Sequence, residues 1–184
     1  MFLNHKINFK STFANRGMSL ENDINITNKY YIDNNIALIY KKPTPIRITK
    51  TDYKSMRITD GFFEAQSTLD YNGIYKGYYI EFDAKETRSK TSYSINNIHK
   101  HQLEHIKKVI EHQGIVFLLI RFSLLNKDYI LKGEDLIEFI KENDRKSIPL
   151  LYFEKKCYQI DIKYAPRLDY IKIVDSLIKE KCYT

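Results

Sequence analysis

The chain of 184 residues has few of the features that mark secreted or membrane proteins. It contains two cysteines, Cys157 and Cys182, which are too few for a disulfide framework and fit a reducing cytoplasm. Its longest fully apolar run, Ile115 to Ile120, is far shorter than the ~18 residues that a membrane span needs. The N-terminus has neither a long apolar core nor a small-residue cleavage site, so we expect no signal peptide. These absences predict a cytoplasmic protein.

Several common catalytic motifs are also missing. There is no Gly-rich phosphate loop of the Walker or Rossmann type and no Gly-x-Ser-x-Gly elbow. The cysteines have no CxxC or paired-histidine spacing, so no structural zinc site is indicated. The stretch "HQLEH", from His101 to His105, matches the pattern of inverted zinc peptidases. That function needs a third ligand which the sequence does not signal, and we expect these histidines to face solvent or to approach a phosphate.

The charge of the chain is basic and concentrated in one segment. Thirty basic and 23 acidic residues give a net charge of +7, which suggests polyanionic partners. Between positions 41 and 57 there are six lysines and arginines against a single acid, Asp52. Tyr53, Phe62 and Phe63 interleave aromatic rings with this charge, which suits base stacking. The alternative is a solvated loop with aromatic anchors.

Hydrophobic periodicity predicts alternating helices and strands, and therefore an α/β fold with a mixed sheet. We expect a helix from Leu20 to about Asp33, capped by Ser19, and a long helix from Ser94 to Gly114. The proline-containing segment "KKPTPIRITK" favours an extended, projecting chain, and the stretch to about Thr68 is long for a simple connection. Further predicted elements are strands at 36–40, 115–121, 128–131 and 157–162 and helices at 133–144 and 168–179.

The stretch "LDYNGIYKGYYIEFDAKET" predicts a hairpin that carries charged groups. In a strand from Tyr78 to Lys85, alternate side chains form an apolar face, and Glu81, Asp83 and Lys85 share the other. A tight turn at Lys76–Gly77 would place Asp70 opposite Asp83. An Asp followed at this distance by Asp-x-Lys is the arrangement of PD-(D/E)xK metal-dependent nucleases, although Leu69 replaces the usual proline. The alternative is a half-exposed sheet with charges on its wet face.

Several stretches together resemble one family, the RecU Holliday junction resolvases. They are "RGMSLENDINITNKYY", "KKPTPIRITKTDY", "STLDYNGIYKGYYIEFDAKET", "HKHQLEHIK" and "YAPRLDYIKIVD", and they extend from residue 16 to residue 175. The resemblance implies a restriction-endonuclease-like mixed β-sheet flanked by helices, with a projecting stalk segment. From the residues themselves we expect a mobile N-terminal arm at 1–18, and then a single nuclease domain at 19–184 that contains the stalk at about 41–68.

The same resemblance implies a Mg²⁺-dependent endonuclease that resolves four-way DNA junctions by paired symmetric nicks in recombination and repair. Mn²⁺ is an alternative metal, and the implied partners are junction DNA, a second copy of the chain and RecA recombinase. The matching positions assign Asp70, Asp83 and Lys85 to catalysis, and Thr68, Asp70, Asp83 and Gln102 to the metal.

Two alternatives and two open points accompany this resemblance. The chain would otherwise be a non-cutting junction-binding or recombinase-regulating protein, or another PD-(D/E)xK nuclease that acts on linear duplex. Asp83 stands where relatives usually have Glu, and the shorter side chain requires a closer metal or a bridging water. Glu21 begins the first predicted helix, where an acid favours the helix dipole, and a third metal-site acid is the alternative.

Overall fold

The computed structural model describes residues 19–63 and 68–182, so the N-terminal arm expected at 1–18 lies outside the described residues. The body contains a six-stranded sheet in the order β1-β4-β5-β7-β8-β10. Strands β5 and β7 run parallel at its centre, and the other neighbouring strands are antiparallel. The bounds are β1 Leu38–Lys41, β4 Tyr71–Tyr75, β5 Tyr78–Thr87, β7 Ile115–Phe122, β8 Lys127–Lys132 and β10 Tyr158–Ile160.

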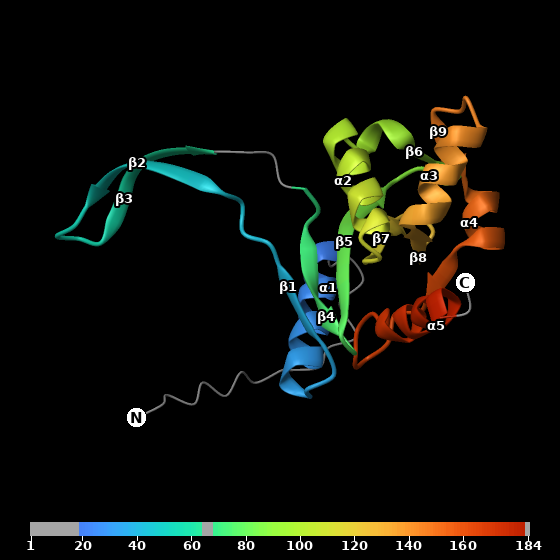
Figure 1. Ribbon diagram of the computed structural model, residues 1–184, viewed down its shortest axis with the longest axis horizontal. Helices are drawn as coiled ribbons and strands as arrows, with labels where there is room; N and C mark the ends of the chain where they lie inside the picture. The colour runs from blue at the N-terminus through green and yellow to red at the C-terminus, as the bar shows by residue number, and fades with distance from the viewer. Residues whose placement is uncertain (1–18, 64–67, 183–184) are drawn as a thin grey trace.

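Helices cover both faces of this sheet, which confirms the predicted α/β class (Figure 1). Helices α1 (Leu20–Asp33) and α5 (Ile171–Cys182) bury their apolar side chains with those of one face. Helices α2 (Lys100–Glu111), α3 (Gly133–Glu142) and α4 (Leu150–Lys156) do so on the other. Strand β7 is buried at every position, as its continuous apolar run predicts.

The β4–β5 hairpin has the predicted geometry. Its two turn residues, Lys76 and Gly77, have φ values of 50° and 83°, the left-handed conformation of the tight turns that match the twist of paired strands. Tyr71 pairs with Phe82, so one step further along the ladder Asp70 comes opposite Asp83. The turn therefore sets which two carboxylates meet.

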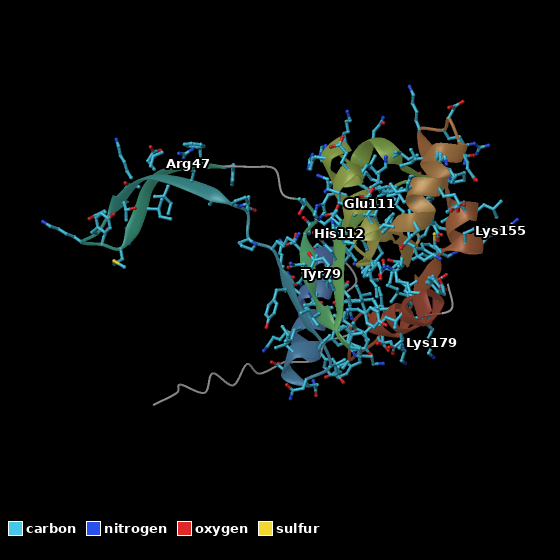
Figure 2. All side chains as sticks on the ribbon, viewed as in Figure 1. Arg47, Tyr79, Glu111, His112, Lys155 and Lys179 are labelled. Carbon is cyan, nitrogen blue, oxygen red and sulfur yellow. The ribbon has the colours of Figure 1, made fainter. Side chains whose placement is uncertain are left out.

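A second hairpin projects away from the body (Figure 1). It consists of β2 (Ile46–Asp52) and β3 (Arg57–Phe63), paired antiparallel and exposed along almost their whole length. We call residues 46–63 the stalk. Figure 2 shows Arg47 on the stalk, far from Tyr79 on the body. An isolated two-stranded ribbon is marginally stable in water, so its exposed apolar and basic side chains suit a bound partner.

A buried ionic network ties α1 to the centre of the sheet. The Arg121 guanidinium on β7 lies 2.8 Å from Asp23 of α1 and 2.7 Å from Asp128 of β8, and Arg167 contacts Asp23 at 2.9 Å. The Arg121 side chain is 8 % exposed and both carboxylates are 1 % exposed. Buried charges persist only when paired, so this network is a structural element and lies apart from the predicted site.

Some predicted boundaries are wrong. Ser94 does not begin a long helix: β6 (Ser92–Ser94) and the 3₁₀ turn η1 (Ile95–Asn97) come first, and α2 begins after His99. Strand β6 pairs with β9 (Ser147–Pro149), and this pairing with a distant segment overrides local helical spacing. The closing helix begins at Ile171 rather than Leu168, and α4 was not predicted.

The two carboxylates on the charged face of β5 are not exposed to solvent. Glu81 and Asp83 are both 0 % exposed, because α2 packs over them with Gln102 and His105. The opposite face, with Ile80 and Phe82, packs in the core as expected. Residues 80–83 of β5 are therefore covered on both sides, and the two carboxylates are shielded from water.

Candidate active site

Two carboxylates meet at the start of β4 and the middle of β5. The Asp70 carboxyl lies within hydrogen-bonding reach of Asp83, as the strand register requires. The Asp83 Oδ2 atom is 2.7 Å from the Lys85 ammonium and accepts a bond from the Gln102 amide nitrogen at 3.2 Å. The Asp83 Oδ1 atom is buried and has no hydrogen-bond partner among the described residues.

This crowding perturbs the protonation of Asp83. Burial and, after it, the neighbouring Asp70 carboxyl raise the pKa of Asp83 to about 7, although the Lys85 ammonium works to lower it. Two carboxylates in contact cannot both be ionised without a cation between them. Perturbed acids of this kind concentrate at catalytic sites.

Lys85 and Gln102 complete the cluster around Asp83. The Lys85 side chain is 19 % exposed, so its ammonium both contacts Asp83 and remains accessible. The Gln102 oxygen accepts bonds from the His99 backbone at 3.2 Å and from Lys85 at 3.4 Å. Gln102 thus caps the start of α2 and holds Asp83 at the same time.

Thr68 lies beside the cluster and contacts a different carboxylate. Its hydroxyl accepts a bond from Lys42 at 2.9 Å and donates to Glu81 at 3.4 Å. The structure therefore brings Asp70, Lys85 and Gln102 around Asp83 and places the Thr68 hydroxyl next to Glu81.

Glu81 was not among the expected site residues. Its carboxylate also contacts Lys42, the Tyr79 hydroxyl and His105. Burial works to raise the pKa of Glu81, but the hydrogen bonds from Lys42, His105 and Tyr79 outweigh it, so the pKa lies below its ordinary value. The signal in the sequence was its position two residues before Asp83 on the same strand face.

The histidine pattern and Glu21 have other roles. His105 bonds Glu81 rather than facing solvent, and His101 stacks on His99 with ring centroids 5.4 Å apart. Within residues 19–63 and 68–182, no three acids, cysteines or histidines gather as a zinc site would require. Glu21 is exposed and paired with Lys41. It lies in the first turn of α1, where an acid is favourable because of the helix dipole, so its position does not require a metal.

The donor set around Asp83 fits a hard divalent cation. Mg²⁺ prefers oxygen ligands and usually keeps several waters, so two carboxylates with neighbouring neutral oxygens suffice. The Oδ1 atom of Asp83 has no hydrogen-bond partner among the described residues and lies in a carboxyl beside that of Asp70. A cation bound there would reduce the repulsion between the two carboxylates, so the residues present fit such a metal.

An aspartate that immediately precedes one strand and faces Asp-x-Lys on the antiparallel neighbour, in a mixed sheet between helices, defines the class of metal-dependent nucleases with a restriction-endonuclease-like fold. Comparison with known proteins narrows the class. Residues 15–176 match RecU, Recombination protein U, and the chain belongs to this family.

Relatives named "Holliday junction resolvase RecU" match most of the chain. The protein from Geobacillus kaustophilus is 46 % identical over 90 % of this chain and 86 % of its own length. Those from Streptococcus mutans and Staphylococcus aureus are each 47 % identical, over 90 % and 92 % of this chain and 86 % and 84 % of their own lengths. Among the described helices, none is long and apolar enough to cross a membrane.

Proposed function

We propose that this protein is a Mg²⁺-dependent endonuclease that resolves four-way DNA junctions by paired symmetric nicks in recombination and repair. The contact between Asp70 and Asp83, beside the Lys85 ammonium, carries the proposal. The names of its relatives supply the substrate class. Such a protein would act in the cytoplasm on chromosomal DNA, with RecA recombinase as a further partner expected from the family resemblance.

Each residue has a distinct part in phosphodiester hydrolysis. Asp70 and Asp83 would hold the metal, and Thr68 and Gln102 would add neutral oxygens directly or through water. When bound, the metal neutralises phosphate charge and lowers the pKa of a water molecule. Lys85, held 2.7 Å from Asp83, orients the attacking water and places a positive charge where negative charge develops on phosphorus.

The stalk would enter the open centre of the junction. It projects from the body, and Arg47, Lys50, Lys54 and Arg57 are exposed on it. Each phosphate that they neutralise on duplex DNA contributes about −0.9 to the slope of log affinity against log salt concentration. Replacing residues 46–63 by a short glycine-serine loop should abolish the preference for junction over linear duplex. A retained preference would contradict this role.

A homodimer would match the two-fold symmetry of the junction and supply two cuts. An apolar row supports this proposal: Leu38, Ile74 and Tyr79 lie side by side on β1, β4 and β5, and are 52 %, 56 % and 41 % exposed. The row lies on the same sheet face as Asp83, so a second copy seated there would bring the two sites near each other.

Analytical ultracentrifugation tests the dimer. Ile74→Glu should shift the protein toward monomer, whereas Leu124→Glu, at a 50 % exposed position on another surface, should not. A monomeric wild-type protein at micromolar concentration would overturn the proposal.

The decisive activity test uses a mobile four-way junction labelled on each strand, incubated with and without Mg²⁺ and with Mn²⁺. Symmetric nicks that require the metal support the proposal, and zinc-dependent activity would not. Binding without product would support a regulatory protein, and sequence-dependent cutting of linear duplex would support another nuclease of the class.

A further inference from the structure

A buried carboxylate on β5 joins the two connections that link the stalk to the sheet. Glu81 is 0 % exposed and lies two residues before Asp83. Its Oε1 atom accepts bonds from Lys42 and from the Thr68 hydroxyl, 3.4 Å away. Its Oε2 atom accepts from the Tyr79 hydroxyl at 2.9 Å and lies 2.9 Å from His105 Nε2.

These four partners occupy the acceptor positions of Glu81. An ionised carboxylate has about four lone-pair positions, two on each oxygen. Each oxygen of Glu81 has two partners, so no lone pair is left for a metal ion. Asp83 is different, because its Oδ1 atom has no donor among residues 19–63 and 68–182. The two neighbouring acids therefore have separate roles.

Two of the partners come from the points where the chain leaves the sheet and returns to it. Lys42 follows β1 directly and begins the outgoing connection to the stalk. Thr68 lies three residues before β4, at the end of the returning connection. The Lys42 ammonium donates to the Thr68 hydroxyl at 2.9 Å, and its backbone N–H donates to the Asp70 carbonyl at 2.7 Å. Lys42 and Glu81 thus close the root of the stalk.

We propose that Glu81 is a positioning residue that fixes the direction in which the stalk leaves the sheet, and thereby places the bound DNA strand over Asp83. The claim about the placement of DNA rests on the proposed function. The claim that Glu81 fixes the direction of the stalk does not. A rigid root matters because a displacement of about 1 Å at a reacting centre can lower the rate about 100-fold.

The conformational part is tested without DNA or metal. Spin labels at Thr59 on the stalk and Glu138 on α3, in a background that lacks both native cysteines, report the distance between stalk and body. Glu81→Gln and Lys42→Met should each broaden the distance distribution, and the double variant should broaden it no further. Distributions equal to that of the parent would overturn the proposal, whether or not the protein cuts junctions.

The catalytic part is tested by mapping nicks on a four-way junction under single-turnover conditions. Glu81→Gln should move cuts to neighbouring phosphates and lower the rate of paired cutting about tenfold or more, while metal-dependent cutting itself persists. Tyr79→Phe is the matched control: it removes one bond to the same carboxylate but keeps the aromatic ring in the proposed dimer row and the contacts of Lys42 and Thr68, and should leave the nick positions unchanged.

The possible outcomes separate the explanations. A merely structural Glu81 would lower the fraction of folded protein, measured by urea unfolding, and leave nick positions unchanged; that result overturns the proposal. Complete loss of cutting with unchanged label distances would assign Glu81 to the chemistry and also overturn it. A wild-type protein that does not cut junctions would refute the proposed function alone, because the label distances still decide the conformational part.

Discussion

Asp83→Asn should stabilise the metal-free protein at neutral and higher pH. Burial and the Asp70 carboxyl raise the pKa of Asp83 from 3.8 to about 7. This rise corresponds to about 4 kcal/mol, because a tenfold change in a proton equilibrium is about 1.4 kcal/mol. An asparagine carries no charge, its amide can donate to Asp70, and its oxygen can accept from Lys85. We expect a gain of about 2–4 kcal/mol in the free energy of unfolding at pH 8.

The direction of the pH dependence follows from the raised pKa. A carboxyl whose folded-state pKa lies above its unfolded value contributes stability that is fully present below about pH 4 and is lost as the pH rises through about 7. The wild-type protein should therefore lose stability relative to Asp83→Asn between pH 4 and pH 8. Protonated Asp83 and asparagine are similar in shape, so the two proteins should be nearly equal near pH 4.

Urea unfolding in EDTA at pH 4, 5, 6, 7 and 8 measures this difference. The exposed Asp161→Asn is the control for a simple loss of negative charge. Added Mg²⁺ should stabilise the wild-type protein more than Asp83→Asn, since a ligand stabilises only the state that binds it. A pH-independent difference, or a variant less stable than wild type at pH 8, would refute the reasoning.

Three further substitutions test separate parts of the structure. Lys85→Ala should lower the rate of junction cutting at least about 100-fold with little change in a gel-shift Kd; cutting near the wild-type rate would remove Lys85 from the mechanism. Arg121→Met removes the cation that pairs with the buried Asp128 and leaves Asp23 with Arg167 alone; it should cost about 3–5 kcal/mol by urea unfolding, against less than about 1 kcal/mol for the exposed Lys29→Met. Gly73→Ala would place Cβ 1.9 Å from the Leu38 carbonyl oxygen, and thermal unfolding should show a loss of about 1–3 kcal/mol or more; an unchanged Tm would contradict that packing.

The parts of the fold that were predicted correctly depend on local rules. The hairpin follows from a turn that needs positive φ at Lys76 and Gly77, and its register follows from the turn. The encounter of Asp70 with Asp83 was therefore predictable from spacing alone. Helix α1 was also correct at both ends, because Ser19 caps it and its apolar stripe has helical spacing.

The errors arise where distant segments decide the structure. Ser94 is a good helix cap in isolation, but it forms a strand because its neighbours pair with residues 147–149. The same limit applies to the charged face of β5. Alternation predicts that Glu81 and Asp83 share a face, whereas only the packing of α2 decides that this face is buried. Lys42, distant in the sequence, becomes a partner of Glu81 only through the fold.

The burial of both acids on one strand explains why they have different chemistry. Bringing a carboxylate into an environment of low polarity costs free energy unless its lone pairs find donors. Glu81 has four partners, so its charge is compensated and its side chain is fixed in place. Asp83 has donors on one oxygen only and an acid beside it, so the folded chain alone does not compensate its charge. A divalent cation would supply the missing positive charge. The uncompensated charge of Asp83, which destabilises the metal-free protein, would then favour metal binding.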